Sequence, residues 1–102
     1  MESDWRKFRD MVPQLRERSL AGCNARIASV LADPKKNETD RFWDALEQME
    51  KEAKILRNCL DGHSRSSMSL FMSLMLHHGM LTREDLLQFS EELQKTLSRA
   101  FQ

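Results

Sequence analysis

The feature that most constrains the fold is a heptad pattern of apolar residues between positions 42 and 60. Its members are separated by alternating intervals of four and three residues: Phe42, Leu46, Met49, Ala53, Leu56 and Leu60. This spacing places apolar side chains along one side of an α-helix. The pattern therefore predicts a helix from about Asp40 to Leu60, capped by Asn37 or Thr39 and ended by Gly62.

Three further helices are predicted from apolar spacing and from helix-start residues. The first runs from Asp4, as its N-cap, to about Ala32, with a kink or a break near Pro13. The third spans about Ser64 to His78, and the fourth starts at Thr82 and continues to the C-terminus. Only three glycines and two prolines occur in 102 residues, which favours a few long helices over many short strands.

These segments predict a single all-α domain of residues 1–102. Short connections make successive helices antiparallel neighbours, so we expect an antiparallel up-down bundle of four helices. Residues 1–36 carry eight basic and five acidic side chains, whereas residues 38–61 carry four basic and seven acidic ones. This opposite charge favours pairing of the first two helices.

The overall composition excludes several classes of protein. The chain holds 16 basic and 16 acidic residues, which argues against generic affinity for DNA or anionic lipid. The longest uncharged run, residues 66–82, is shorter than the roughly 20 apolar residues of a membrane span. Two cysteines and no secretory signal pattern predict a cytoplasmic protein with free thiols, although a bridge between Cys23 and Cys59 is the alternative.

The predicted third helix is apolar on two sides, separated by a strip of serines. A helix of this kind needs cover on both sides, and four helices of a small monomer can hardly surround one of their own number. We therefore predict a homodimer whose interface lies on this helix and includes Met68, Leu70, Phe71, Met72, Leu74 and Met75. The alternative is a central helix that its own chain covers.

The basic residues near the N-terminus suggest a second class of function. They interleave with Trp5 and Phe8, as in a helix that binds a nucleic-acid backbone: Arg6, Lys7, Arg9, Arg16 and Arg18. Three acidic residues, Asp4, Asp10 and Glu17, interrupt this patch, which is more typical of a solvated helix face. Nucleic-acid binding is therefore possible from the pattern, but it is not the favoured function.

Two motifs suggest chemistry but lack the expected context. Cys59 and Arg65 have the spacing of a cysteine-phosphatase loop, but a predicted helix precedes Cys59, where such a loop normally follows a strand. Cys59 with His63, or the methionine stripe, could bind a metal, but no spacing supplies about four convergent ligands. We therefore predict no catalytic, cofactor or metal site.

The favoured function is a small non-enzymatic interaction protein, such as an adaptor, inhibitor or regulator, that acts through the methionine-rich surface. A dimeric nucleic-acid-binding transcriptional regulator is the alternative. A thiol phosphatase or a metal carrier comes third.

Overall fold

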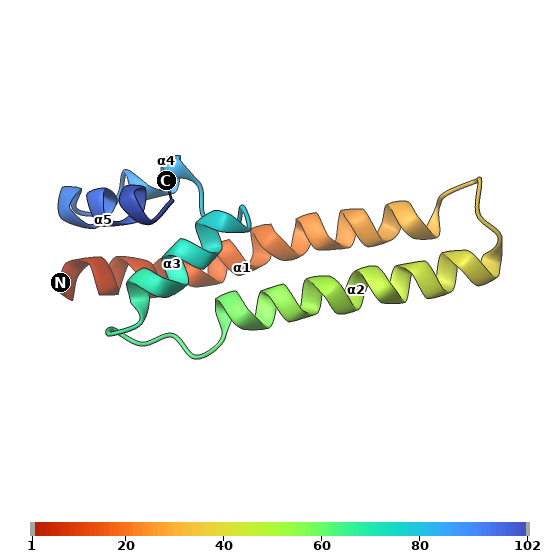
Figure 1. Cartoon of the computed structure of the whole chain (residues 1–102), viewed down its shortest axis with the longest axis horizontal. Helices are drawn as coiled ribbons and strands as arrows, with labels where there is room; N and C mark the ends of the chain where they lie inside the picture. Colours follow the sequence, from red (N-terminus) through yellow and green to blue (C-terminus); the bar gives the residue numbers. More distant parts are fainter. Residues whose placement is uncertain (1, 102) are drawn as a thin grey trace.

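The computed structural model describes the backbone of residues 2–101 and the side chains of residues 2–99. Over this range the chain is all-helical, with no strand, as the sequence predicts. Five helices follow one another, not the predicted four: α1 Glu2–Leu31, α2 Glu38–Leu60, α3 Met68–His77, α4 Arg83–Leu86 and α5 Glu91–Phe101. Figure 1 shows α1 and α2 as a long antiparallel hairpin, with α3, α4 and α5 gathered at one end of it.

Helix α1 is one continuous helix that includes Pro13, so the alternative of a break there is wrong. Pro13 is exposed, while Val12 and Leu15 on either side of it are buried in the core, which holds both halves of the helix in place. The predicted N-cap is also wrong, because the helix already includes Glu2 and Asp4 lies within its first turn.

Helix α2 agrees closely with its predicted range. The Asn37 side chain caps it by accepting a hydrogen bond from the Asp40 amide at 2.8 Å. At the other end, Gly62 has a φ of 78°, a left-handed conformation that a residue without Cβ adopts readily. The predicted stop signal is therefore confirmed.

The C-terminal third of the chain departs from the prediction in two places. Helix α3 begins at Met68, because Ser64 and Ser67 form a hydrogen-bonded turn before it. The predicted fourth helix is two helices, α4 and α5, separated by residues 87–90. Thr82 caps α4 in a reciprocal capping box with Asp85, so that start signal is confirmed.

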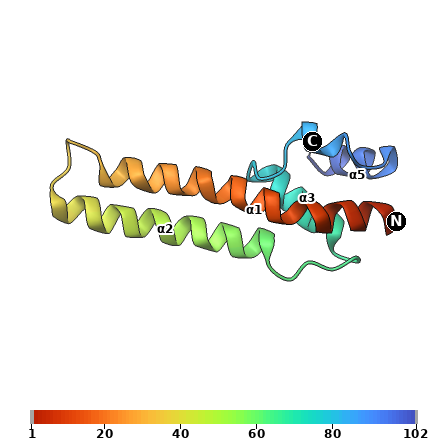
Figure 2. The ribbon, with the colours of Figure 1, turned by 180° about the vertical axis from the view of Figure 1, so that it is seen from behind.

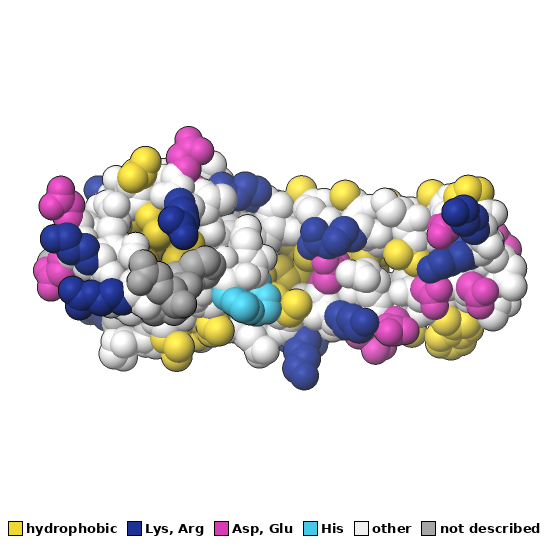
Figure 3. Space-filling view, turned by 45° about the horizontal axis from the view of Figure 1, so that its top comes forward, with side chains coloured by type: hydrophobic (Ala, Val, Ile, Leu, Met, Phe, Trp, Pro, Cys, Tyr) yellow, Lys and Arg dark blue, Asp and Glu magenta, His cyan; other side chains and the backbone are white. Residues whose placement is uncertain are grey.

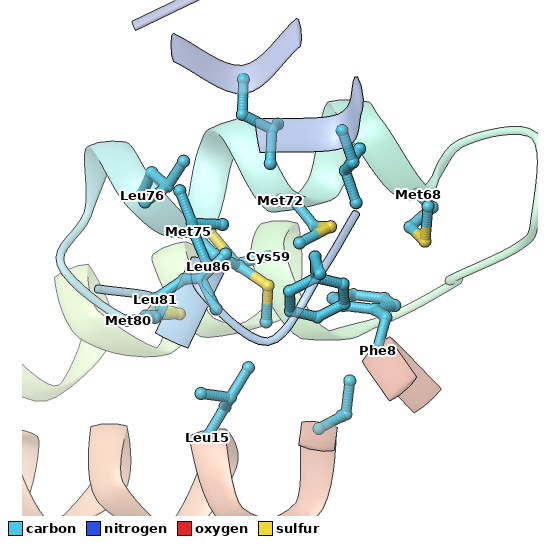
Figure 4. Close-up of a cluster of buried hydrophobic side chains, with 14 of the residues drawn as sticks. Phe8, Leu15, Cys59, Met68, Met72, Met75, Leu76, Met80, Leu81 and Leu86 are labelled. Atoms are coloured by element: carbon cyan, nitrogen blue, oxygen red, sulfur yellow. The ribbon is translucent and has the colours of Figure 1, made fainter. Parts of the chain in front are cut away.

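The core lies at the end of the molecule where α3, α4 and α5 pack on the hairpin (Figure 4). Phe8 of α1, Cys59 of α2, Met72 and Met75 of α3, and the nearby Leu81 are all at most 2% exposed. We call this part the body. The rest of the hairpin, residues 19–53, extends from it as an arm that α3, α4 and α5 do not cover (Figure 2), and the molecule measures 52 × 24 × 20 Å.

Candidate interaction surface

The first half of α2 carries large hydrophobic side chains that stay exposed to solvent. Phe42 and Trp43 are each 59% exposed, Met49 is 50% exposed and Leu46 is 38% exposed. Phe42 and Trp43 meet edge to face, with ring centroids 5.0 Å apart. These exposed residues include half of the heptad pattern that identified α2 as a helix.

The exposed part of the pattern lies beside the contact with α1, because another side of α2 packs against that helix. Ala45, Glu52 and Cys59, spaced seven residues apart, are buried on the side toward α1. At about 100° per residue, this side lies about 90° around the helix from Phe42, Leu46 and Met49. A small alanine and a charged glutamate thus occupy the contact, while the larger apolar residues lie beside it.

Helix α1 adds apolar residues to the same side of the hairpin. Leu20, Ile27 and Leu31 fall within about 40° of one another around α1, and Leu31 is 49% exposed. Leu20 borders a groove together with Leu56 and Leu60 of α2, which shows that the two apolar stripes share one side. We call the apolar surface formed by both stripes the arm face: the half-buried Leu20 and Ile27 and the exposed Leu31, Phe42, Leu46 and Met49, with Trp43 exposed at its outer edge.

The groove that Leu20 borders lies at the body end of the arm face. It has a volume of about 170 Å³, its apolar wall is formed by Leu20, Leu56 and Leu60, and its charged rim by Arg16, Arg57 and Asp61. We call it the end groove. It lies on α2 fourteen residues from Phe42, which corresponds to about 21 Å along a helix.

The opposite side of the arm is polar and is built around a buried carboxylate. Glu52 is 8% exposed and forms an ion pair through its Oε1 with Arg26, which also contacts the Cys23 sulfur at 3.5 Å. Its Oε2 is buried without a hydrogen-bond partner. A pocket of about 190 Å³ adjoins this cluster. Burial, and then the Glu52 charge, raise the pKa of the Cys23 thiol, so this thiol stays protonated at neutral pH.

The predicted interface on α3 is mostly enclosed by the chain itself. Met68, Met72 and Met75 are buried in the core of the body, and Phe71 and Leu74 are partly buried against it. Leu70 alone of the six predicted residues is largely exposed, at 62%. The methionine side of α3 thus faces the chain's own core, and one leucine remains on its outer side.

The five basic residues predicted as nucleic-acid contacts do not gather into one patch on α1. Lys7 donates to the Gln88 carbonyl at 2.6 Å, and Arg18 donates to Asp85 at 2.6 Å and to the Met80 carbonyl at 2.8 Å. Arg9 and Arg16 are exposed on the nearly opposite side of α1, and Arg6 is exposed about 110° around the helix from Lys7 and Arg18. Lys7 and Arg18 therefore attach α1 to the C-terminal third of the chain, and nucleic-acid binding stays a prediction.

The phosphatase spacing corresponds to two residues in very different surroundings. Cys59 is 0% exposed, and burial raises the pKa of its thiol, whereas thiol catalysis needs a lowered one. Arg65 lies at the surface and forms an ion pair with Glu2 at 2.8 Å. Cys23 and Cys59 are both free and buried in the structure.

Within residues 2–101, no three His, Cys, Asp or Glu side chains are arranged to hold a metal ion. His63, a possible ligand beside Cys59 in the sequence, instead contacts the Cys59 carbonyl at 2.7 Å. Its ring packs at a tilt against Phe8 and edge to face against Phe71. Of the described helices, none combines the length and apolar character that crossing a membrane requires.

No family model matches the chain, and no curated protein or solved structure compared with it is significantly similar.

Proposed function

We propose that this chain is a small non-enzymatic interaction protein that binds another protein surface through the arm face. The observation that carries the proposal is the exposure of Phe42, Trp43, Leu46 and Met49 on one end of α2. Contiguous apolar surface on a small protein marks a contact site, since exposing it to water has a free-energy cost that a partner removes. The homodimer expected from the sequence is part of this proposal, but its interface moves from α3 to the arm.

The composition of the surface also favours protein recognition. Aromatic residues and methionine are enriched in the centres of protein interfaces, where truncating a well-packed aromatic costs about 2 kcal/mol or more of binding energy. Phe42 and Trp43 form such a pair. On the face of the molecule that Figure 3 presents, by contrast, basic and acidic side chains lie among the hydrophobic ones along the arm. An adaptor, an inhibitor or a regulator would each use a surface of this kind.

Site-specific photo-crosslinking in the producing cells tests the proposal. A photoreactive amino acid at Phe42 or Met49 should give covalent adducts after irradiation. The same residue at Lys51 is the matched control, because Lys51 is exposed on the same helix but points away from the arm face. Adducts at positions 42 and 49 that exceed those at position 51 would support the proposal, whether the attached chain is another protein or a second copy. Equal labelling at all three positions would contradict it.

A further inference from the structure

We infer that the occupant of the arm face is a second copy of this chain, bound antiparallel, so that two arms form a four-helix bundle. The inference rests on the proposed function, because it names the partner of the same surface. It depends on three observations: the size of the arm face, the complementary shapes at its two ends, and the charge distribution along α2.

The arm face is large enough for a stable dimer. Helix α2 has 23 residues and is therefore about 34 Å long, and two adjacent helices are about 20 Å wide. Together, the arm face and the end groove therefore extend over roughly 700 Å², close to the ~800 Å² per partner that specific complexes bury. A contact limited to the α2 stripe would be smaller, so the occupant must cover both helices, as another two-helix arm would.

The two ends of the arm face have complementary shapes. One end carries the protruding Phe42, and the other end has the hollow end groove lined by Leu20, Leu56 and Leu60. In a two-fold symmetric contact, every residue that meets a site on the partner offers the same site in return. An antiparallel pair of arms would therefore place each Phe42 in the partner's end groove, and both hollows would be filled at once.

The charges on α2 favour the same orientation. Residues 38–50 hold five acidic and one basic side chain, a net charge of −4, whereas residues 51–60 hold three basic and one acidic, a net charge of +2. Glu38, whose side chain is 88% exposed, lies at the Phe42 end, and Arg16 and Arg57 lie on the rim of the end groove. In an antiparallel pair, the acidic end of each α2 lies beside the basic end of the other. Arms whose loops at residues 32–37 meet would instead place the two acidic ends side by side.

The arrangement defines a two-fold axis at a specific residue. If Phe42 of one copy meets Leu56 of the other, the midpoint of the contact on α2 is Met49. The two Met49 side chains should then lie next to each other. The loops at residues 32–37 should lie at opposite ends of the bundle, about 40 Å apart.

Two experiments on the purified full-length chain test the inference. Light scattering should give twice the mass of 12.0 kDa, and Phe42→Asp should raise the dissociation constant at least about 30-fold while circular dichroism shows unchanged helix content. Leu87→Glu and Leu70→Glu are matched controls, because these leucines are 72% and 62% exposed on the body. Both control variants should remain dimeric.

The orientation is tested by disulfide trapping. Met49→Cys should form a covalent dimer rapidly on oxidation, and Lys35→Cys in the loop should not. The reverse result would overturn the antiparallel arrangement. A dimer that survives Phe42→Asp but dissociates with Leu70→Glu would overturn the arm contact in favour of α3. If the purified chain is a monomer and photo-crosslinks from Phe42 attach a different protein, the inference that a second copy occupies the arm face is wrong. The proposed function would still hold.

Discussion

The carboxylate of Asp4 accepts two hydrogen bonds from Ser90, one from its amide at 2.9 Å and one from its hydroxyl at 2.6 Å. The two residues are 86 positions apart, and Asp4 is 2% exposed. The Ser90 hydroxyl oxygen also accepts a hydrogen bond from the Leu93 amide at 3.2 Å, which caps α5. This contact therefore joins the first turn of α1 to the first turn of α5 and closes the body.

Replacing Asp4 should destabilise the body. Asp4→Ala removes a charged acceptor and leaves the Ser90 amide without its partner, so we expect a loss of about 1.5–3 kcal/mol in the free energy of unfolding, measured by urea denaturation. Asp10→Ala is the control, because Asp10 is exposed on the same helix, and it should change the free energy by less than about 0.5 kcal/mol. Equal effects of the two variants would show that the Asp4 contact contributes no stability.

The methionines of α3 should behave as core residues. Met72 is 0% exposed, so Met72→Ala would create a cavity and should cost about 2–5 kcal/mol of stability. Leu70→Ala, two residues away and largely exposed, should cost less than about 0.5 kcal/mol. If Met72→Ala changed the free energy of unfolding only slightly, Met72 would not be a core residue and would again be a candidate for an interface.

The buried Glu52 should reduce the stability of the arm. Its Oε2 has no hydrogen-bond partner, whereas the side chain of its ion-pair partner Arg26 is 57% exposed and can be solvated without it. Glu52→Leu removes the buried charge, so we expect the free energy of unfolding to rise by about 1 kcal/mol. A loss of more than about 2 kcal/mol in thermal or urea unfolding would instead show that the ion pair stabilises the arm.

Acid should weaken the contact between α1 and α4. Burial raises the pKa of Asp85, but hydrogen bonds from Arg18 and Thr82 outweigh it and hold the pKa below its usual 3.8. A lowered pKa in the folded state means that the contribution is complete above the usual value and is lost as the pH falls through the lower folded value. Asp85→Asn should therefore destabilise the protein near neutral pH, and its difference from the parent chain should shrink below about pH 4.

Denaturant titrations at a series of pH values measure this difference. Glu84→Gln is the control, since Glu84 is exposed beside Asp85 but lies outside the capping box, and it should have the smaller effect at neutral pH. A difference between Asp85→Asn and the parent chain that stays constant down to pH 2 would contradict the assignment.

Both cysteines should be unreactive in the folded chain. Burial raises the pKa of Cys59 and of Cys23, so both the thiolate fraction and the access of reagents are reduced. We expect a thiol-specific chromogenic reagent to react at least about tenfold more slowly than in the urea-unfolded chain. Fast labelling of Cys59 in the folded protein would contradict this expectation and would favour the thiol phosphatase considered from the sequence.

Local signals in the sequence predicted the helices better than they predicted the packing. The Asn37 cap, the Gly62 stop and the Thr82 start each act within a few residues, and all three are confirmed. The break before α5 was missed because it depends on Ser90 meeting Asp4, a partner 86 residues away. Ser90 is an ordinary N-cap residue, and this was the available signal.

The apolar pattern of α2 shows why the candidate site was also hard to predict. The spacing shows that Phe42, Leu46 and Met49 share one side of the helix. It does not show whether that side packs against this chain or against a partner. The hairpin instead uses Ala45, Glu52 and Cys59 for its contact, and the methionines of α3, which resembled an interface, fill the core. Hydrophobicity is the same signal in both cases, so only the three-dimensional arrangement separates them.

The uneven placement of the core gives the molecule a gradient of local opening. Within the arm, the only described hydrophobic side chains that are buried are Cys23 and Ala45. Backbone amides near the loop at residues 32–37 should therefore exchange with solvent through fraying of the hairpin tip, while those of the body exchange only when the whole domain unfolds. Slower exchange at the tip after a partner is added would report occupancy of the arm without any knowledge of what the partner is.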